Sequence, residues 1–341
     1  MRYFILNMLS LLLCYPVYSQ SFDLLVNKPG VSFRGLDTHE EHTVWVSGSE
    51  GTVGRSADGG DTWTWVSPQG YEAFDFRDIE VFSAEQAVIV SAGSPAVILS
   101  TEDGGTTWVE VYRNDDSRIF LNGMDFQGTV GYILGDPIAG QFQLLKSTDE
   151  GRTWDDVSEK SRLSAKSGEV AFAASGSSLQ LIGDALYIGS GGSVARLFKT
   201  ELEGEAPFKG LNVPMRSGIE STGIFSIDFF NAHIGVVVGG DYKNDEDNHH
   251  NIWLTENGGL SWRQPEQPVS GYRSCVKYIS DELLVATGTS GTDISADGGN
   301  TWKLISKKSF NVIATTNKGH VYLAGSQGDI VRLEMANPIP R

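Results

Sequence analysis

The 341-residue sequence predicts an all-β fold, a seven-bladed β-propeller of four-stranded antiparallel blades whose last blade is completed by the N-terminal strand. Three observations predict this fold. One eight-residue turn motif occurs five times, its copies lie about one blade apart, and short segments of alternating apolar and polar residues fill the intervals. Together they indicate one repeated β unit, although the length of the chain would also allow two domains.

The repeated motif reads Ser or Thr, any residue, Asp or Asn, any residue, Gly, two further residues and Trp. Its acidic or amide positions are Asp58, Asp103, Asp149, Asn257 and Asp297. The side-chain oxygen at this position can accept N–H bonds inside a tight turn, and the glycine supplies a positive φ. The tryptophan starts the returning strand and can bury its ring against the neighbouring unit. These five residues are therefore predicted to be structural.

The spacing of the motif predicts the number of blades. Adjacent copies are about 40–46 residues apart, a typical blade length. The longer interval between positions 149 and 257 contains a degenerate unit at residues 198–204, which lacks the Asp and the Trp. A last unit from Phe310 to Leu333 has only three strands. Residues 22–27 can supply its fourth strand and close the ring, which removes the exposed sheet edges.

The N-terminus predicts export. Residues 1–19 combine Arg2, a short apolar run and small residues at a cleavage position near Ser19, as in a signal peptide. Residues 20–341 then form the single propeller domain. The apolar run is too short to span a bilayer. Cleavage would leave Cys275 as the one remaining cysteine, so we expect no intramolecular disulfide. We expect a monomer that is periplasmic or extracellular and not inserted in a membrane.

The charge and the motifs restrict the possible partners. A formal net charge of −17 argues against nucleic acid, because such partners need clustered lysine and arginine. The glycine-rich stretch at residues 189–192 lacks the lysine and helix of a phosphate-binding loop, and no dinucleotide-binding fingerprint occurs. We therefore expect no cofactor.

A candidate ligand site comes from the first strand of each predicted blade, which begins with an apolar residue and then a variable one. Alternation along a strand turns the variable residue toward the central channel. These residues are Arg34, Arg77, Asn122, Ala173, Ser226, Arg273 and Asn311. The three arginines fall on blades 6, 1 and 2 and should crowd one side of the channel mouth. A carboxylate ligand would compensate their charge, and the planar guanidinium group suits it.

Internal ion pairing is the alternative explanation of these arginines, because Asp78, Asp125 and Glu169 lie close to ring positions in the sequence. Chain topology adds Asp136 and Asp241 to the same face, opposite the motif hairpins. A polar insertion at residues 241–251 also belongs to this face, where insertions often add function. Its acids and histidines lack the spacing of a known metal motif, so we interpret it as a solvated loop and expect no metal site.

The motif resembles the Asp box, or BNR repeat, of sialidase-like and WD40/YVTN/BNR-like propellers. The seven-unit arrangement resembles the photosystem II stability/assembly factor-like family and its exported bacterial relatives. Stretches that carry this resemblance are residues 168–175, 239–242 and 288–291, and it extends over about residues 22–335. The resemblance implies a propeller fold. It says less about activity, because Asp boxes occur in enzymes and in non-enzymes.

Two functions follow from the resemblance. The first is a binding or assembly module for a small anionic ligand, a glycan or a peptide or protein partner. The second is a glycoside hydrolase of sialidase type, in which an arginine triad would hold a carboxylate. Its candidate catalytic residues are Asp78, Asp136, Glu169, Asp241 and Tyr242. The Phe/Tyr-Arg-Ile-Pro start that is typical of sialidases is absent, since Phe33-Arg34 continues as Gly-Leu. We favour the binding module.

Overall fold

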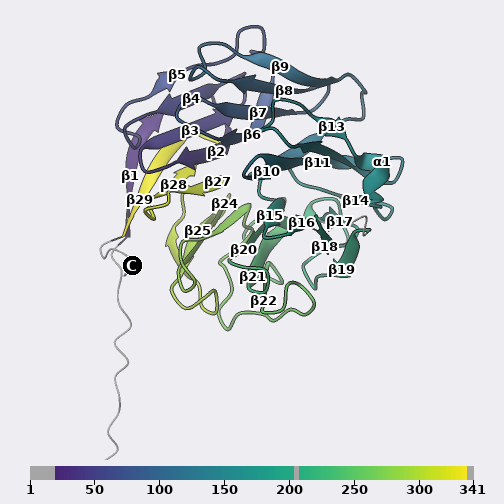
Figure 1. The fold of residues 1–341 in the computed structure, drawn as a ribbon. Helices are drawn as coiled ribbons and strands as arrows, with labels where there is room; N and C mark the ends of the chain where they lie inside the picture. Colours follow the sequence, from purple (N-terminus) through teal and green to yellow (C-terminus); the bar gives the residue numbers. More distant parts are fainter. Residues whose placement is uncertain (1–19, 203–206, 336–341) are drawn as a thin grey trace, which may run out of the picture.

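The computed structural model describes residues 20–202 and 207–335, so the predicted signal peptide lies outside the described residues. The described chain forms seven antiparallel sheets, which Figure 1 shows arranged around a centre. Helical structure in this part is limited to α1 (Ser158–Ser161). The predicted all-β, seven-bladed propeller is confirmed.

The first three blades follow the predicted order, with four consecutive strands each. Blade 1 contains β2 (Phe33–His39), β3 (Thr43–Gly48), β4 (Val53–Ser56) and β5 (Thr64–Trp65). Blade 2 contains β6 (Asp75–Val81), β7 (Ala87–Ala92), β8 (Ala96–Thr101) and β9 (Val109–Asn114). Blade 3 contains β10 (Leu121–Gln127), β11 (Val130–Ile138), β12 (Gln141–Ser147) and β13 (Asp155–Asp156).

Blades 4 to 6 depart from this pattern at one point, where two short strands join blade 5 at β20. Blade 4 contains β15 (Leu179–Ile182), β16 (Ala185–Gly189), β18 (Arg196–Glu201) and β19 (Lys209–Asn212). The sheet of blade 5 contains β14 (Glu169–Val170), β17 (Gly191–Gly192), β20 (Thr222–Phe229), β21 (Gly235–Asp241) and β22 (Ile252–Thr255). Blade 6 contains β23 (Cys275–Tyr278), β24 (Leu284–Gly288), β25 (Gly291–Ser295) and β26 (Lys303–Ser306).

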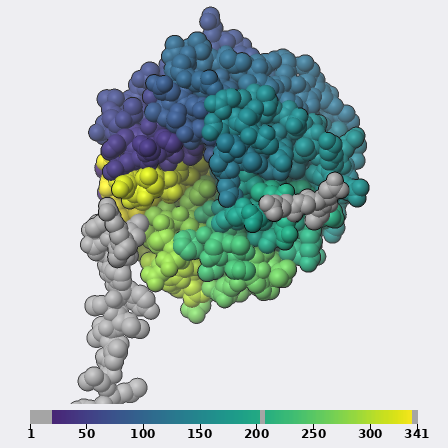
Figure 2. Space-filling view, viewed as in Figure 1, coloured from purple at the N-terminus to yellow at the C-terminus, as the bar shows by residue number. Residues whose placement is uncertain are grey.

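The last blade closes the ring as the sequence predicts. It contains β27 (Val312–Thr315), β28 (Val321–Ala324), β29 (Asp329–Met335) and the N-terminal β1 (Gln20–Asn27). Strand β1 pairs antiparallel with β29 along its length, and the Phe22 ring stacks on Phe310 at 5.9 Å between centroids. Figure 2 shows the N-terminal and C-terminal parts of the chain lying against each other. The outer strand of blade 7 therefore comes from the opposite end of the chain.

The core lies between neighbouring blades. Phe33, Phe76 and Phe310, each at the start of an innermost strand, have no solvent exposure. Burial of one such ring stabilises the fold by about 1.5–3 kcal/mol. Each of these rings belongs to a buried cluster that it shares with residues of the neighbouring blade, so these positions form the core between blades.

The Asp boxes form the expected turns. In the first box, Thr62 N donates to Asp58 Oδ1 at 2.8 Å, and Gly60 N donates to Ser56 Oγ at 2.8 Å. Gly60 has a φ of +97°. The same pattern of bonds recurs at Asp103, Asp149, Asn257 and Asp297. Gly59 N also donates to His42 O at 2.8 Å, which places the box beside the turn between β2 and β3. The boxes therefore lie at the end of the blades opposite the starts of the innermost strands.

The predicted start of blade 4 is wrong. Phe172 and Ala173 were expected to open its first strand, but that strand is β15 and begins at Leu179. The residues before it have no regular strand structure. They cross the central channel, as described below.

Within residues 20–202 and 207–335, no helix has the length and hydrophobicity needed to cross a bilayer.

Candidate functional site

A pocket of about 310 Å³ lies at the channel mouth where the innermost strands begin. Arg34 from β2 and Arg77 from β6 line it together with Asn311. Its walls are largely aromatic, and the aromatic lining residues are Phe120, Phe172, Phe225, Tyr242 and Tyr272. We call this cavity the arginine pocket. It combines cationic groups with apolar walls, as binding sites for organic carboxylates do.

Arg34 has no acidic partner within the described part of the chain. Its Nη1 donates to Ala174 O at 3.2 Å, and no ion pair involves its guanidinium group. Burial, and then the neighbouring charge of Arg77, lower the pKa of Arg34 below its ordinary value. Both effects disfavour the charged form, so an anion placed here would remove an unfavourable interaction.

Arg77 is partly compensated. Its Nε donates to Asp75 Oδ2 at 2.7 Å, and its Nη1 donates to Ala173 O at 3.5 Å. Both members of the ion pair keep about a third of their side-chain surface exposed. Internal ion pairing, the alternative explanation from the sequence, thus holds for Arg77 and fails for Arg34.

The bulges of the innermost strands explain which residues reach the pocket. The pairing register shifts at Arg34 in β2, at Arg77 in β6 and at Asn122 in β10. In blade 5 the shift falls on Phe225, so Phe225 lines the pocket, whereas Ser226 was expected there. Ser226 is fully buried and does not line the pocket. Its Oγ accepts a hydrogen bond from Val276 N at 3.0 Å.

Arg273 is also displaced by one residue from its predicted position. Ser274 N donates to Thr287 O in blade 6 as Asn311 N donates to Ala324 O in blade 7, so Ser274 occupies the channel position. A shift of one residue turns a side chain to the other face of a strand. The Arg273 side chain is accordingly fully buried, and its Nε donates to the buried Asp293 Oδ2 at 2.7 Å. The expected arc of three arginines is wrong at this position.

Two asparagines of the predicted site differ in their surroundings. Asn311 lines the arginine pocket, where its Nδ2 donates to Phe33 O at 2.8 Å. Asn122 is almost fully buried; its Nδ2 lies 3.5 Å from Asp136 Oδ1, and its own Oδ1 has no hydrogen-bond partner within the described chain.

The two predicted acids of this face lie outside the pocket lining. Asp136 accepts a bond from Ala171 N at 3.1 Å, and burial raises its pKa to about 6. Asp241 is buried and lies 3.5 Å from the Arg216 guanidinium. The insertion at 241–251 begins at the pocket, since Tyr242 lines it. Over the described residues, no group of three or more His, Cys, Asp or Glu side chains has the geometry of a metal site.

The candidate catalytic residues of the hydrolase alternative are not gathered at the pocket. Of the five, only Tyr242 belongs to its lining. Glu169 has no exposed side-chain surface and binds Arg196 Nε at 2.8 Å. Asp78 faces a different cavity. The three-arginine clamp is also not formed, because Arg273 is bonded to Asp293.

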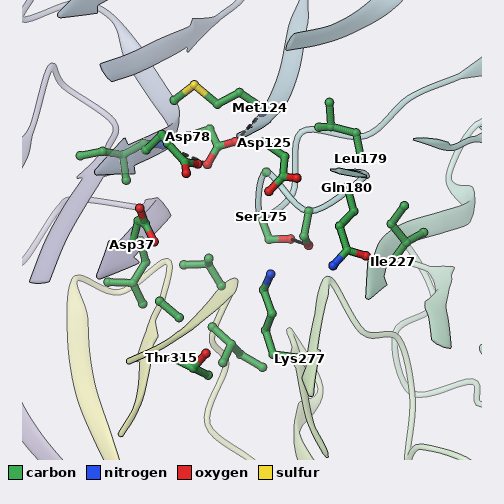
Figure 3. A pocket seen from close by; sticks show the side chains of 18 residues that line it. Asp37, Asp78, Met124, Asp125, Ser175, Leu179, Gln180, Ile227, Lys277 and Thr315 are labelled. Carbon is green, nitrogen blue, oxygen red and sulfur yellow. Dashed lines mark hydrogen bonds between the residues drawn. The ribbon is translucent and has the colours of Figure 1, made fainter. Parts of the chain in front are cut away.

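A second cavity of about 170 Å³ lies deeper in the channel and was not predicted. Each innermost strand contributes one residue to a ring at this depth of the channel, and that residue pairs with the second or third residue of the strand that follows. These seven residues are Asp37, Glu80, Asp125, Gln180, Asp228, Lys277 and Ala314, and all of them except Asp228 line the cavity. Figure 3 shows the Lys277 amine pointing into the space between Asp37, Asp125 and Gln180. We call these residues the acidic ring.

The acidic ring has more carboxylates than cations. Lys277 Nζ lies 3.9 Å from Asp228 Oδ1. Burial raises the pKa of the remaining acids, and repulsion by neighbouring carboxylates raises the pKa of Asp125 and Glu80 further. Burial raises the pKa of Asp37 to about 6 and that of Asp125 to about 7. The pKa of Glu80 is raised well above its ordinary value, first by burial and then by Asp37 and Asp125. A signal was present in the sequence for four of the seven: Asp37, Glu80, Asp125 and Ala314 each follow the apolar residue at the predicted start of the strand by four positions.

The comparisons with known proteins agree with the fold. Residues 75–204 match the family model described as photosynthesis system II assembly factor YCF48. The photosystem II stability/assembly factor HCF136 of Arabidopsis thaliana is 32% identical over 75 residues, which are 21% of this chain and 18% of that protein. The matched segment thus spans less than a fifth of that relative.

Two solved structures are similar over nearly the whole chain. The first, titled YCF48 bound to D1 peptide, has a TM-score of 0.64 at 16% identity and covers 93% of this chain and 97% of that one. The second, YCF48 from Cyanidioschyzon merolae, has a TM-score of 0.65 at 15% identity, with 91% and 98% covered. At these identities the likeness shows the fold. The chain is thus a BNR-repeat propeller that resembles the photosystem II assembly factors.

Proposed function

We propose that this propeller is an assembly or scaffold module that binds a peptide segment of a partner protein, with a carboxylate of that segment held in the arginine pocket. The observation that carries the proposal is Arg34, a cation without an acidic partner in an aromatic-lined cavity. Support for a peptide ligand comes from the similar propeller described as YCF48 bound to D1 peptide. The likeness gives no partner for this chain.

The pocket favours a carboxylate beside an apolar group. A guanidinium group binds a carboxylate through paired N–H bonds, and these are stronger in a partly desolvated site. The Phe120 and Tyr272 rings provide apolar contact area next to the charge. A chain terminus and an Asp or Glu side chain both supply this chemistry, so the test must separate them.

The test uses arrays of random octapeptides. One array carries free C-terminal carboxylates, a second carries terminal amides, and a third carries internal acidic residues with amidated ends. The strongest binder is then titrated against the purified protein by calorimetry, together with its matched carboxamide. We expect the acid to bind more tightly by at least about tenfold, the value of one charge-assisted hydrogen bond.

Two variants test the pocket itself. Arg34→Met should abolish the preference for the acid, because it removes the unpaired cation but keeps an apolar side chain of similar length. Arg152→Met is the matched control, since Arg152 is a partly exposed, ion-paired arginine of an Asp box at the opposite end of the blades. Equal binding of acid and carboxamide by the natural protein would reject the proposed function.

We further propose that the protein is exported. The support is the signal-like composition of residues 1–19. Expression of the full chain in a bacterium, followed by N-terminal sequencing of the protein outside the cytoplasm, tests this proposal. A protein that stays in the cytoplasm with residues 1–19 intact would contradict it.

A further inference from the structure

The segment Ala171–Ser177 separates the two cavities of the channel. Its first part, which includes Ala173 and Ala174, lines the arginine pocket. Its last part, Ser175 to Ser177, lines the cavity of the acidic ring. The segment is therefore the floor of one cavity and the roof of the other, and a ligand in the arginine pocket rests on it.

Hydrogen bonds fix this segment to the blades across the channel. Ser175 Oγ donates to Ser274 O of blade 6 at 2.7 Å. Ser177 Oγ donates to Ser226 Oγ of blade 5 at 2.7 Å, and its carbonyl accepts a bond from Ile227 N at 2.8 Å. Because the partners are rigid innermost strands, the backbone of the segment is held in one place.

Gly176 permits the crossing. Its φ is +74°, a conformation that L-residues rarely adopt. A Cβ atom at this position would overlap the carboxyl group of Asp78, which faces the segment from β6. A side chain at position 176 would thus push the segment away from β6.

The floor also holds the two arginines. Ala174 O accepts the bond from Arg34 Nη1, and the adjacent Ala173 O accepts the bond from Arg77 Nη1. The two carbonyl groups are consecutive, so a shift of the segment would move both acceptors together. One N–H of each guanidinium group is used in this way, and the direction of the remaining N–H groups follows from it.

We propose that Ala171–Ser177 is the positioning element of the arginine pocket, and that the hydrogen bond of Ser175 and the backbone turn at Gly176 set the preference of the pocket for a carboxylate. This inference rests on the proposed function. Arg34 and Arg77 bind the carboxylate of the ligand. The segment acts through them, because its carbonyl groups orient both guanidinium groups. A misaimed guanidinium group keeps its charge but loses the paired geometry that distinguishes a carboxylate from a carboxamide.

The test measures the ratio of the affinities for the acidic octapeptide and for its matched carboxamide. Ser175→Ala removes the bond to Ser274 O and creates no steric overlap. We expect the ratio to fall about tenfold, the value of one charge-assisted hydrogen bond, while the carboxamide binds as before. Gly176→Ala should lower the ratio further. Ser158→Ala is the matched control, because Ser158 is a buried serine that bonds to Leu144 in the outer part of blade 3.

The outcomes separate this inference from the proposed function. If Arg34→Met abolishes the preference for the acid but Ser175→Ala and Gly176→Ala leave it unchanged, the positioning role is wrong and the proposed function stands. If the natural protein binds the acid and the carboxamide equally, the proposed function is wrong, and the positioning role, which rests on it, is wrong as well. Equal weakening of acid and carboxamide in Ser175→Ala would also reject the positioning role, because it would indicate a general loss of structure.

Discussion

The acidic ring predicts that the protein becomes less stable as the pH rises from 5 to 8. Burial raises the folded-state pKa of Asp125 to about 7, whereas an unfolded chain has the ordinary value of 3.8. The folded state therefore binds more protons than the unfolded state between these two values. Stability from this group is fully present below about pH 4 and is lost as the pH rises through about 7.

The magnitude follows from the shift. A pKa of about 7 in the folded state corresponds to a loss of about 2–3 kcal/mol of unfolding free energy between pH 5 and pH 8. Asp37, with a pKa of about 6, adds about 1 kcal/mol in the same direction. Partial solvent contact of the ring screens these interactions, so we expect about 2 kcal/mol in total.

Other carboxylates do not cancel this effect. The pKa values of Asp58 and Asp116 are lowered to about 2, chiefly by bonds from Thr62 and Arg118. The stability that they contribute is present above about pH 4 and is lost only as the pH falls toward 2. The interval from pH 5 to pH 8 therefore reports on buried carboxylates whose pKa is raised, which are those of the ring together with Asp78 and Asp136, and the Asp125 variant isolates the part that comes from the ring.

Urea unfolding followed by tryptophan fluorescence at pH 5, 6, 7 and 8, at constant ionic strength, measures the effect. Asp125→Asn should reduce the slope and make the protein more stable at pH 8, because the amide oxygen can still accept the bond from Leu181 N. Asp155→Asn, a change at an exposed carboxylate of β13, should leave the slope unaltered. Stability that is constant or increases from pH 5 to pH 8 in the natural protein would refute the reasoning.

Three further predictions concern the fold. Deletion of residues 20–27 should lower the melting temperature markedly, because it exposes the edge of β29; an unchanged temperature would contradict the closure. Asp297→Ala should cost about 1–2 kcal/mol in urea unfolding by removing the acceptor of a turn N–H, whereas no loss would show that the box is dispensable. Arg273→Met should cost about 3–5 kcal/mol because it leaves Asp293 buried without a partner, while Arg34→Met should change stability little; similar losses for both would contradict the assignment of Arg273 to the core.

The fold was predictable because its signals are local. An Asp box places its hydrogen-bond donors and acceptors within eight residues, so the turn can be recognised without knowledge of distant contacts. The positions of the boxes then give the blade boundaries, and the incomplete last unit predicts the pairing of β1 with β29. Blade 4 lacks a complete box, and the predicted start of its first strand was wrong.

The site was predictable only in part, because its residues are selected by strand register. Arg34, Arg77 and Asn311 were placed correctly at the pocket from alternation alone. Arg273 was not, because blade 6 is offset by one residue from the predicted alignment, so that Ser274 takes the channel position. The residue at which the pairing register shifts depends on contacts between strands, so the residue types along one strand do not reveal it.

The channel also shows why net charge gave little guidance to the ligand. The chain carries 43 acidic and 26 basic residues, which suggests a surface that repels anions. The structure divides the channel into a cationic pocket and an acidic cavity, with Ala171–Ser177 between them. A cleft lined mainly by charges of one sign focuses their field, so two neighbouring cavities of one channel can favour ligands of opposite charge. The sign of a binding site is therefore set by the few groups that face it, and Arg34 decides it here.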